Sequence, residues 1–335
     1  MERHALVALL QDDTTQPLDW ASAAALAEVE RQYFSRRDFA GFQQFCEELL
    51  DQAAFGPEAR CLVLHNALNG RRRVPEAKTE DVLQFAALVV AEVERLPEGT
   101  HRNWLTAMVN YGLGVFCRDI GKFRLAAQYQ TVAAEAFERL GDTKSTVISW
   151  FLAAVERCND ALVKDEDIAK AVEDLEDAYR VANRVLAGHA WLVNVYLHAI
   201  HARVWAGSAA NTVYEVRDHA LDHLAEMEYG QATFWAHWLR LVAAIRLVEV
   251  GDYAMALATL RAIVERSEAD KQGDVTCTAL LMLARLERGY YNDPVAATAT
   301  ARRLDDWTGN KGRVPQAIGR REFADLLAQT DTPTT

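Results

Sequence analysis

Hydrophobic positions along the chain recur with the helical period, in pairs of segments separated by short polar turns. The clearest pair covers residues 110–142, where the pattern predicts two amphipathic helices on either side of the turn Asp119–Phe123. Small residues at Gly114, Ala126 and Ala133 fall where two neighbouring helices must approach closely. Larger side chains there would push the helix axes beyond the usual separation of about 8–10 Å. The pattern therefore predicts helix-on-helix packing.

Weaker copies of this pattern predict helices along most of the chain. The second-best copy is 241–264, with a turn at Gly251–Tyr253 and small residues at Ala244 and Ala256. The other expected helices cover 2–11, 17–34, 38–50, 57–68, 81–96, 143–159, a stretch that begins after Asp167, 189–206, 212–227, a pair within 276–306, and 315–329. The small residues of the second helices are Ala126, Ala171, Ala256 and Ala296, with Thr212 a weaker candidate between Ala171 and Ala256. They then recur about every 40–45 residues, compared with about 34 in tetratricopeptide repeats.

The turn placement and small residues of 110–142 and 241–264 resemble tetratricopeptide repeats, although the family's closing proline is missing from every unit. This resemblance implies an all-α, right-handed α-solenoid of about seven antiparallel helix pairs plus a C-terminal capping helix. We expect one domain over 1–330 and a disordered tail at 331–335. Long, irregular repeats of this kind are also similar to the sensor and partner-binding domains of bacterial regulators.

Composition supports a helical-repeat protein. The 335 residues exceed one ordinary globular core, and no linker-like stretch divides them. A solenoid accommodates such a length because its core grows by stacking units. Hydrophobic residues make up 50% of the chain, and only seven prolines occur. Because β-branched clusters flanked by turn residues are also nearly absent, we predict an all-α fold.

Charge and cysteine usage restrict the partners and the compartment. The net charge of -12 disfavours nucleic acid and anionic surfaces. The five cysteines are odd in number and widely spaced, which indicates a reducing compartment and argues against a cysteine-rich zinc site. No run of about eighteen apolar residues occurs, so we expect no membrane span. The sequence thus predicts a cytoplasmic protein without a cofactor.

Six of the nine histidines lie between residues 189 and 237. His198 and His201 are three residues apart, whereas His219 and His223 are four apart, so each pair shares a helix face. Two such pairs are compatible with a metal site. The simpler interpretation is that these are ordinary helix residues. This segment is the basis of an alternative function, a small-ligand or metal-binding sensor or enzyme centred on 189–237.

In tetratricopeptide-like scaffolds the first helix of each pair lines a concave groove. Stepping along these helices by three or four residues gives a candidate binding surface: Tyr111, Arg118, Trp150, Arg157, Asn194, His201, Trp238, Arg285 and Arg288. Arginines in an acidic protein suggest capture of carboxylates through forked hydrogen bonds, and tryptophans supply rigid apolar anchors. Pairing of the arginines with neighbouring acids, and burial of the tryptophans in the core, is the competing interpretation.

The remaining patterns indicate no chemistry of their own. The run Arg71–Arg73 and a basic cluster between 302 and 321 are expected to be solvated surface charge, and the acidic segment 165–177 lacks calcium-loop spacing. The sequence contains no nucleophile elbow, phosphate-binding glycine loop or dinucleotide fingerprint. The favoured function is therefore a non-enzymatic scaffold that binds a protein or peptide partner, acidic in character, with a regulatory role.

Overall fold

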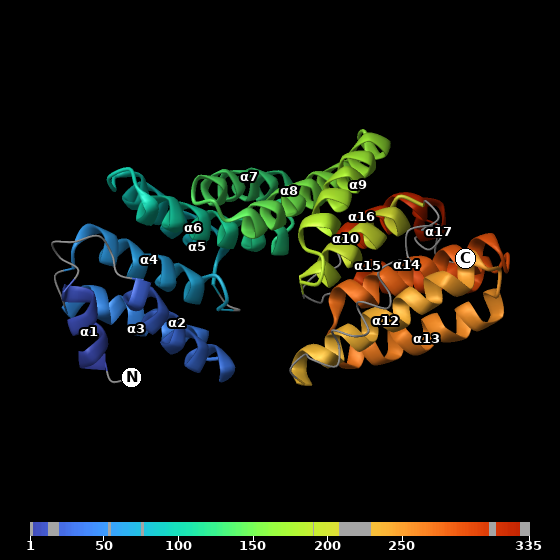
Figure 1. The fold of residues 1–335 in the computed structure, drawn as a ribbon. Helices are drawn as coiled ribbons and strands as arrows, with labels where there is room; N and C mark the ends of the chain where they lie inside the picture. The colour runs from blue at the N-terminus through green and yellow to red at the C-terminus, as the bar shows by residue number, and fades with distance from the viewer. Residues whose placement is uncertain are drawn as a thin grey trace. The chain divides into compact units, whose positions relative to one another are not determined.

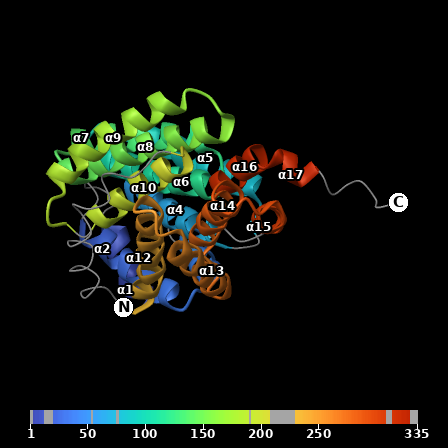
Figure 2. The ribbon, with the colours of Figure 1, turned by 90° about the vertical axis from the view of Figure 1, so that its right-hand side faces the viewer.

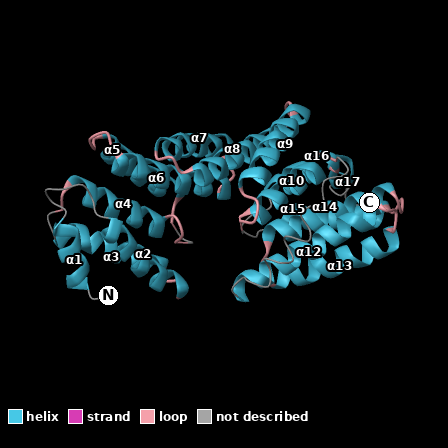
Figure 3. Ribbon diagram, in the orientation of Figure 1, coloured by secondary structure: helices cyan, strands magenta, loops and turns pink. Residues whose placement is uncertain are grey.

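The computed structural model describes residues 3–12, 20–52, 55–74, 77–189, 191–207, 229–307 and 313–328. Within these ranges the chain forms sixteen α-helices and no β-strand, as Figure 3 shows. The prediction of an all-α protein is confirmed. The chain divides into two compact units, Met1–Ala153 and Ala154–Thr335, and the boundary falls inside helix α8 (Thr143–Lys164). The expectation of one domain over 1–330 stays a prediction.

Unit 1 is a succession of helices in which each one packs against the next (Figure 1). Alternate helices also touch, because α4 contacts both α2 and α6. This is the neighbour-to-neighbour packing expected of a helical solenoid. Before α8, its helices are α1 (Arg3–Asp12), α2 (Trp20–Ser35), α3 (Phe39–Gln52), α4 (Pro57–Arg71), α5 (Thr79–Glu94), α6 (Thr100–Asp119) and α7 (Phe123–Arg139).

The turn between α6 and α7 follows from its glycine. Gly121 has φ of 76°, a left-handed conformation that a residue without a Cβ adopts at little cost. The Lys122 N–H donates to the Cys117 carbonyl at 2.8 Å, and the Gly121 N–H donates to the Arg118 carbonyl at 2.9 Å. These bonds satisfy carbonyls at the end of α6 and reverse the chain. The predicted turn is confirmed.

The small residues of this helix pair lie at its interface. Ala126 and Ala133 have no exposed surface, and Gly114 is also buried. A cluster of Ala107, Ala133, Ala136 and Phe137 fills the space between α6 and α7. A larger hydrophobic cluster runs through α1 to α7, and its fully buried side chains include Leu26, Phe42, Leu62, Val89 and Leu113. The prediction of close helix crossings at small residues is confirmed here.

Unit 2 is built around α14, most of whose residues are buried. This helix packs against α12, α13, α15 and α16, and Figures 1 and 2 show α12 to α15 side by side. Beyond the second half of α8, the helices are α9 (Ile168–Val185), α10 (Leu192–Trp205), α12 (Tyr229–Glu249), α13 (Tyr253–Ala269), α14 (Gly273–Gly289), α15 (Pro294–Asp306), α16 (Arg313–Glu322) and α17 (Ala324–Ala328).

Several element boundaries differ from those expected. The helix expected at 143–159 continues to Lys164, and α4 runs on to Arg71, three residues beyond its expected end. The terminal helix is interrupted at Phe323, which separates α16 from α17. Ala297, rather than the expected Ala296, is fully buried in α15. The helix expected at 212–227 lies outside the described residues.

None of the helices in the described ranges combines the length and the apolar character that a bilayer span requires.

Candidate functional site

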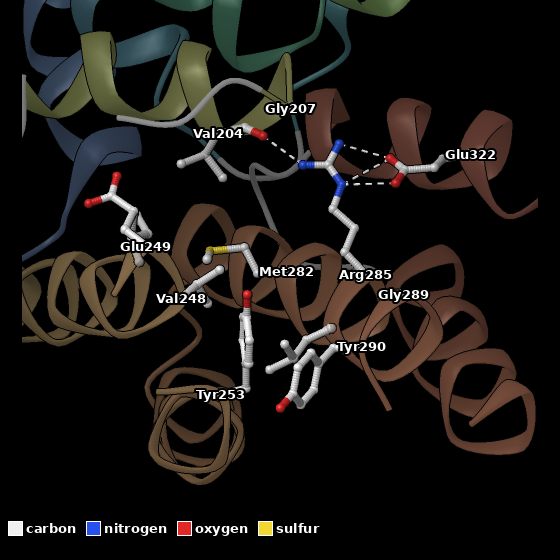
Figure 4. Close-up of a pocket in the computed structure, with 12 residues that line it drawn as sticks. Val204, Gly207, Val248, Glu249, Tyr253, Met282, Arg285, Gly289, Tyr290 and Glu322 are labelled. Atoms are coloured by element: carbon white, nitrogen blue, oxygen red, sulfur yellow. Dashed lines mark hydrogen bonds and ion pairs between the residues drawn. The ribbon is translucent and has the colours of Figure 1, made fainter. Parts of the chain in front are cut away.

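A pocket of about 690 Å³ opens in unit 2 where the ends of α10, α12 and α14 meet the first turn of α13 and the last residue of α16. Figure 4 shows this arrangement. The pocket is lined by Val204, Gly207, Ile245, Val248, Glu249, Tyr253, Met282, Arg285, Leu286, Gly289, Tyr290 and Glu322. Apolar side chains therefore form most of its wall, and charged groups occur at Glu249 and at the Arg285–Glu322 pair.

Two tyrosine rings in tilted contact form one side of the pocket. The ring centroids of Tyr253 and Tyr290 are 3.8 Å apart, and Tyr290 also meets Tyr291 edge-on at 5.1 Å. Tyr253 is the first residue of α13, whereas Tyr290 follows the last residue of α14. The contact between the two rings therefore joins the α12–α13 turn to the α14–α15 turn. Tyrosine rings provide rigid apolar surface with a polar hydroxyl at the tip, a combination common at binding sites.

Arg285 forms the opposite side of the pocket, and its guanidinium is held by four oxygens. Its Nε lies 3.0 Å from both carboxylate oxygens of Glu322, and its Nη2 lies 2.8 Å from Glu322 Oε2. Its Nη1 donates to the Val204 carbonyl at 2.6 Å, and its Nη2 also donates to the Trp205 carbonyl at 3.2 Å. Figure 4 shows the guanidinium between Val204 and Glu322. A forked, charge-assisted contact of this kind is among the stronger protein hydrogen bonds.

Arg288 repeats this contact one turn further along α14. Its Nη1 lies 3.1 Å from Asp325 Oδ1, and its Nη2 lies 2.8 Å from Asp325 Oδ2. Its Nη1 also donates to the backbone carbonyl of Glu322 at 2.9 Å. The guanidinium carbon is 5.9 Å from the ring centroid of Phe323, a fully buried side chain. Both arginines thus pair with acids of the chain itself, which is the competing interpretation given above, and capture of a partner's carboxylates stays a prediction.

An exposed apolar edge adjoins the pocket. It consists of Val250, Met255, Tyr290, Tyr291 and Val295, with exposed fractions from 39% for Tyr291 to 79% for Val295. The described part of the chain has nine exposed large hydrophobic residues, and this edge holds five of them. The five lie together because α12 and α14 end, and α13 and α15 begin, at the same end of the helix stack. We call these five residues the apolar edge.

The predicted groove residues of unit 1 do not share one surface environment. Tyr111 is half-buried, and burial raises the pKa of its hydroxyl. Arg118 pairs with its neighbour Asp119 at 3.2 Å, whereas Trp150 in α8 is 38% exposed.

In unit 2 the predicted groove residues divide between the core and the surface. His201 and Trp238 are buried, with ring centroids 4.0 Å apart, and His201 also stacks on Trp205 at 5.1 Å. Burial lowers the pKa of His201 well below its usual value. Arg157 is exposed, Asn194 is half-buried, and of the predicted groove residues the structure places only Arg285 on the wall of this pocket.

The histidine-rich segment is only partly described. The His189 Nδ1 accepts from the Trp191 N–H at 3.2 Å, and the His237 Nε2 lies 2.7 Å from Asp270 Oδ2. His219 and His223 lie outside the described residues. Among the residues that the structure does describe, no group of three or more histidines, cysteines or acids is arranged to hold a metal ion.

The three consecutive arginines of unit 1 make specific contacts instead of standing as solvated surface charge. Arg71 pairs with Glu47 at 2.9 Å and lies over the Phe85 ring, and Arg73 lies over the Phe34 ring, each guanidinium carbon being 4.4 Å from the ring centroid. The Arg72 Nη1 donates to the carbonyl of Gly112 at 3.2 Å. The expectation of solvated loop charge was wrong for Arg71 and Arg72, because α4 continues to Arg71 and places their side chains against α3, α5 and α6. Arg73 is exposed, although its guanidinium lies over Phe34 of α2.

Sequence reasoning missed Tyr253, Met282, Tyr290 and Glu322. The adjacent aromatics Tyr290–Tyr291, set after the end of a helix, were the available signal for an exposed aromatic site. Comparison of the chain with models of known protein families, with curated proteins and with solved structures gives no match. The function must therefore be argued from the geometry of the site.

Proposed function

We propose that the protein is a non-enzymatic, tetratricopeptide-like scaffold that binds a protein or peptide partner through the unit 2 pocket and the apolar edge. One observation carries the proposal: the apolar edge gathers five of the nine exposed large hydrophobic residues in the described chain. Exposed apolar side chains that are scattered singly are ordinary, whereas contiguous ones mark interaction sites. The pocket beside the edge offers a place for an inserted side chain.

The pocket and the apolar edge are suited to different parts of a partner. Val248, Met282 and Leu286 on the pocket wall favour a bulky apolar group, and Tyr253 and Tyr290 provide aromatic faces for it to stack on. The surrounding edge would then be covered by the partner's backbone and neighbouring side chains. Buried aromatic anchors surrounded by contacts that exclude water are where binding energy concentrates in protein interfaces.

A small apolar ligand is the second candidate, favoured by the pocket itself. A volume of about 690 Å³ falls in the range of about 300–1,000 Å³ that is typical of small-molecule sites. Val204 and Gly207 of the pocket wall belong to the histidine-rich segment 189–237, on which the sequence-based alternative of a small-ligand sensor or enzyme is centred. A regulatory scaffold in the cytoplasm fits either ligand. The five buried cysteine thiols support a reducing compartment.

A matched pair of double variants tests the first candidate. Val250→Ser with Val295→Ser removes apolar surface from the edge, whereas Val132→Ser with Val181→Ser removes exposed valines elsewhere. A photo-crosslinking residue placed at Tyr291 should link a protein from the native host in stoichiometric yield. The edge variant should lower this yield at least about tenfold, as expected for loss of an interface anchor.

The control variant should leave the crosslink unchanged. Equal yields from the edge variant and the control variant would contradict the proposal. A small molecule that copurifies with the chain, identified by native mass spectrometry and lost in a Met282→Trp variant that fills the pocket, would instead support the second candidate.

A further inference from the structure

Two arginines of α14 pair with two acids of the segment 322–325, and the spacing of the arginines matches that of the acids. Arg285 and Arg288 are three residues apart, and so are their partners Glu322 and Asp325. Both contacts are bidentate forks, with nitrogen–oxygen distances between 2.8 and 3.1 Å. The chain's own segment 322–325 therefore lies on α14 as an acid–aromatic–x–acid pattern, with the buried Phe323 between its two carboxylates.

The orientation of Arg285 does not depend on Glu322 alone. The carbonyls of Val204 and Trp205, at the end of α10, hold Nη1 and Nη2 from the other side. These two carbonyls therefore keep the Nε and Nη2 atoms of the Arg285 guanidinium directed towards the position of the Glu322 carboxylate. A guanidinium that is held in advance loses less conformational entropy when it binds a carboxylate, which favours recognition.

A bidentate fork between distant residues is not unique to α14 in the described part of the chain, because Arg303 holds both carboxylate oxygens of Glu268, 35 residues away. Pairs such as Arg31–Glu28 and Arg180–Asp177 link residues three apart on one helix, which is common on helix surfaces and contributes little. The two α14 contacts differ in that two arginines of one helix hold two acids of one segment, each pair 37 residues apart in the sequence. One of the two, Arg285–Glu322, is also part of the pocket wall, so a ligand that fills the pocket meets it directly.

We infer that Arg285 and Arg288 form a carboxylate-recognition site, which the chain's own Glu322 and Asp325 occupy as an internal ligand. This inference rests on the proposed binding function, and it names the partner's chemistry: a peptide with two carboxylates three residues apart that flank an aromatic side chain. Such a peptide competes with segment 322–325. Because the protein carries a net charge of -12, an acidic partner needs a local cationic site of this kind.

The two acids block the carboxylate-recognition site while they are paired with the arginines. Glu322 and Asp325 satisfy both forks, so the arginines bind a second carboxylate only when the internal one leaves. Asp325 is 55% exposed and lies at the start of the five-residue helix α17, so its contact is accessible to a competitor. Removing the charges of Glu322 and Asp325 should therefore increase the affinity of the protein for an acidic peptide. If these two acids instead contacted the peptide directly, their removal would lower that affinity.

The test uses the full chain and a labelled peptide with the sequence of residues 322–328, EFADLLA, followed by fluorescence anisotropy. The double variant E322Q/D325N should bind this probe at least about tenfold more tightly than the wild type, because each charge-assisted hydrogen bond contributes more than a neutral one. Adding R285Q/R288Q to that variant should abolish the gain. The amide probe QFANLLA should bind both chains equally weakly.

The inference is overturned if E322Q/D325N binds EFADLLA no more tightly than the wild type while its melting temperature stays within a few degrees. Should the double variant not fold, D325N alone provides the test, because the exposed Asp325 contributes little to stability. The D325N variant should then bind EFADLLA about threefold more tightly than the wild type, and an unchanged affinity overturns the inference. The probe reports on the arginines without the native partner, so its failure is distinguishable from failure of the apolar-edge test.

Discussion

Gly114 of α6 packs against the side chain of Gln130 of α7. A Cβ atom on Gly114 would lie 2.4 Å from Gln130 Nε2 and 2.8 Å from its Cγ. The Gln130 side chain is buried, and its Nε2 donates to the Tyr111 carbonyl at 3.3 Å. Because the glutamine cannot turn into solvent without losing this bond, the crossing requires a glycine.

Replacing Gly114 with alanine should destabilise unit 1 by about 1–3 kcal/mol, the usual cost of overpacking a filled core. The measurement is urea unfolding followed by circular dichroism. Gly289→Ala is the matched control, because Gly289 is also helical but has open space where its Cβ would lie. The control should be neutral or stabilising by up to about 1 kcal/mol, since alanine is the better helix former. Equal effects of the two substitutions would contradict this explanation.

The sequence predicted those features of the fold that depend on residues close together in the chain. Helical periodicity and small residues located α6, α7 and α13, and glycines marked the turns at Gly121, Gly141 and Gly251, each of which has a positive φ. Asp38 precedes α3 directly, and its Oδ1 accepts from the Gly41 N–H at 2.9 Å, which is the bond of a helix N-cap. Each of these features depends on residues within a few positions of one another, and that is why the sequence indicates them.

The site was predictable only in part because its contacts join distant parts of the chain. Arg285 was placed in a binding groove, but nothing near it in the sequence identifies Glu322 as its partner. Arg321 illustrates the same point: it was expected as solvated charge, yet its Nη1 and Nη2 donate to the Leu162 carbonyl at the end of α8, at 3.1 and 3.2 Å. A cation at a helix C-terminus is favoured by the helix dipole, but which helix end it meets depends on the tertiary fold.

His65 should make the stability of unit 1 depend on pH. Its Nε2 lies 3.3 Å from Asn69 Nδ2, while Asn69 Oδ1 accepts from Arg72 Nε at 3.1 Å. The Arg72 bond fixes the amide orientation, so Nε2 must accept and the ring must be neutral. Burial, together with the neighbouring Arg72, lowers the pKa of His65 to about 3.

Because the folded-state pKa lies below the unfolded value of about 6.5, the unfolded chain binds the proton first. Stability is therefore retained above about pH 6.5 and falls as the pH drops towards 3, by at most about 1.4 kcal/mol per pH unit from this residue. His65→Gln offers a neutral acceptor at the Nε2 position. Urea unfolding at pH 7 and pH 5 should show a smaller difference for this variant than for the wild type, and an unchanged difference would exclude His65 as the cause.

Glu287 should be one of the main polar contributors to the stability of unit 2. This buried carboxylate accepts from Thr300 Oγ1 at 2.7 Å and from Arg261 Nη2 at 3.1 Å, so it connects α13, α14 and α15. Glu287→Ala leaves the buried Thr300 hydroxyl without this acceptor and should cost about 1–3 kcal/mol in thermal or urea unfolding. Arg261→Lys keeps a cation beside the buried carboxylate and should cost less than about 1 kcal/mol, because the arginine itself is 56% exposed. A larger loss from Arg261→Lys than from Glu287→Ala would contradict this explanation.

The five cysteines should react with a thiol reagent only when the unit that holds them unfolds. All five are buried thiols, and burial raises the pKa of Cys61 to about 11 and those of Cys158 and Cys277 to about 12. At pH 8 these thiols are therefore both inaccessible and protonated, whereas the thiolate is the reactive form. We expect negligible labelling of the native protein and five labels in denaturant. Mass spectrometry across a urea series separates Cys46, Cys61 and Cys117 of unit 1 from Cys158 and Cys277 of unit 2. Two distinct labelling midpoints would show that the units unfold separately, and one shared midpoint would show a single cooperative domain.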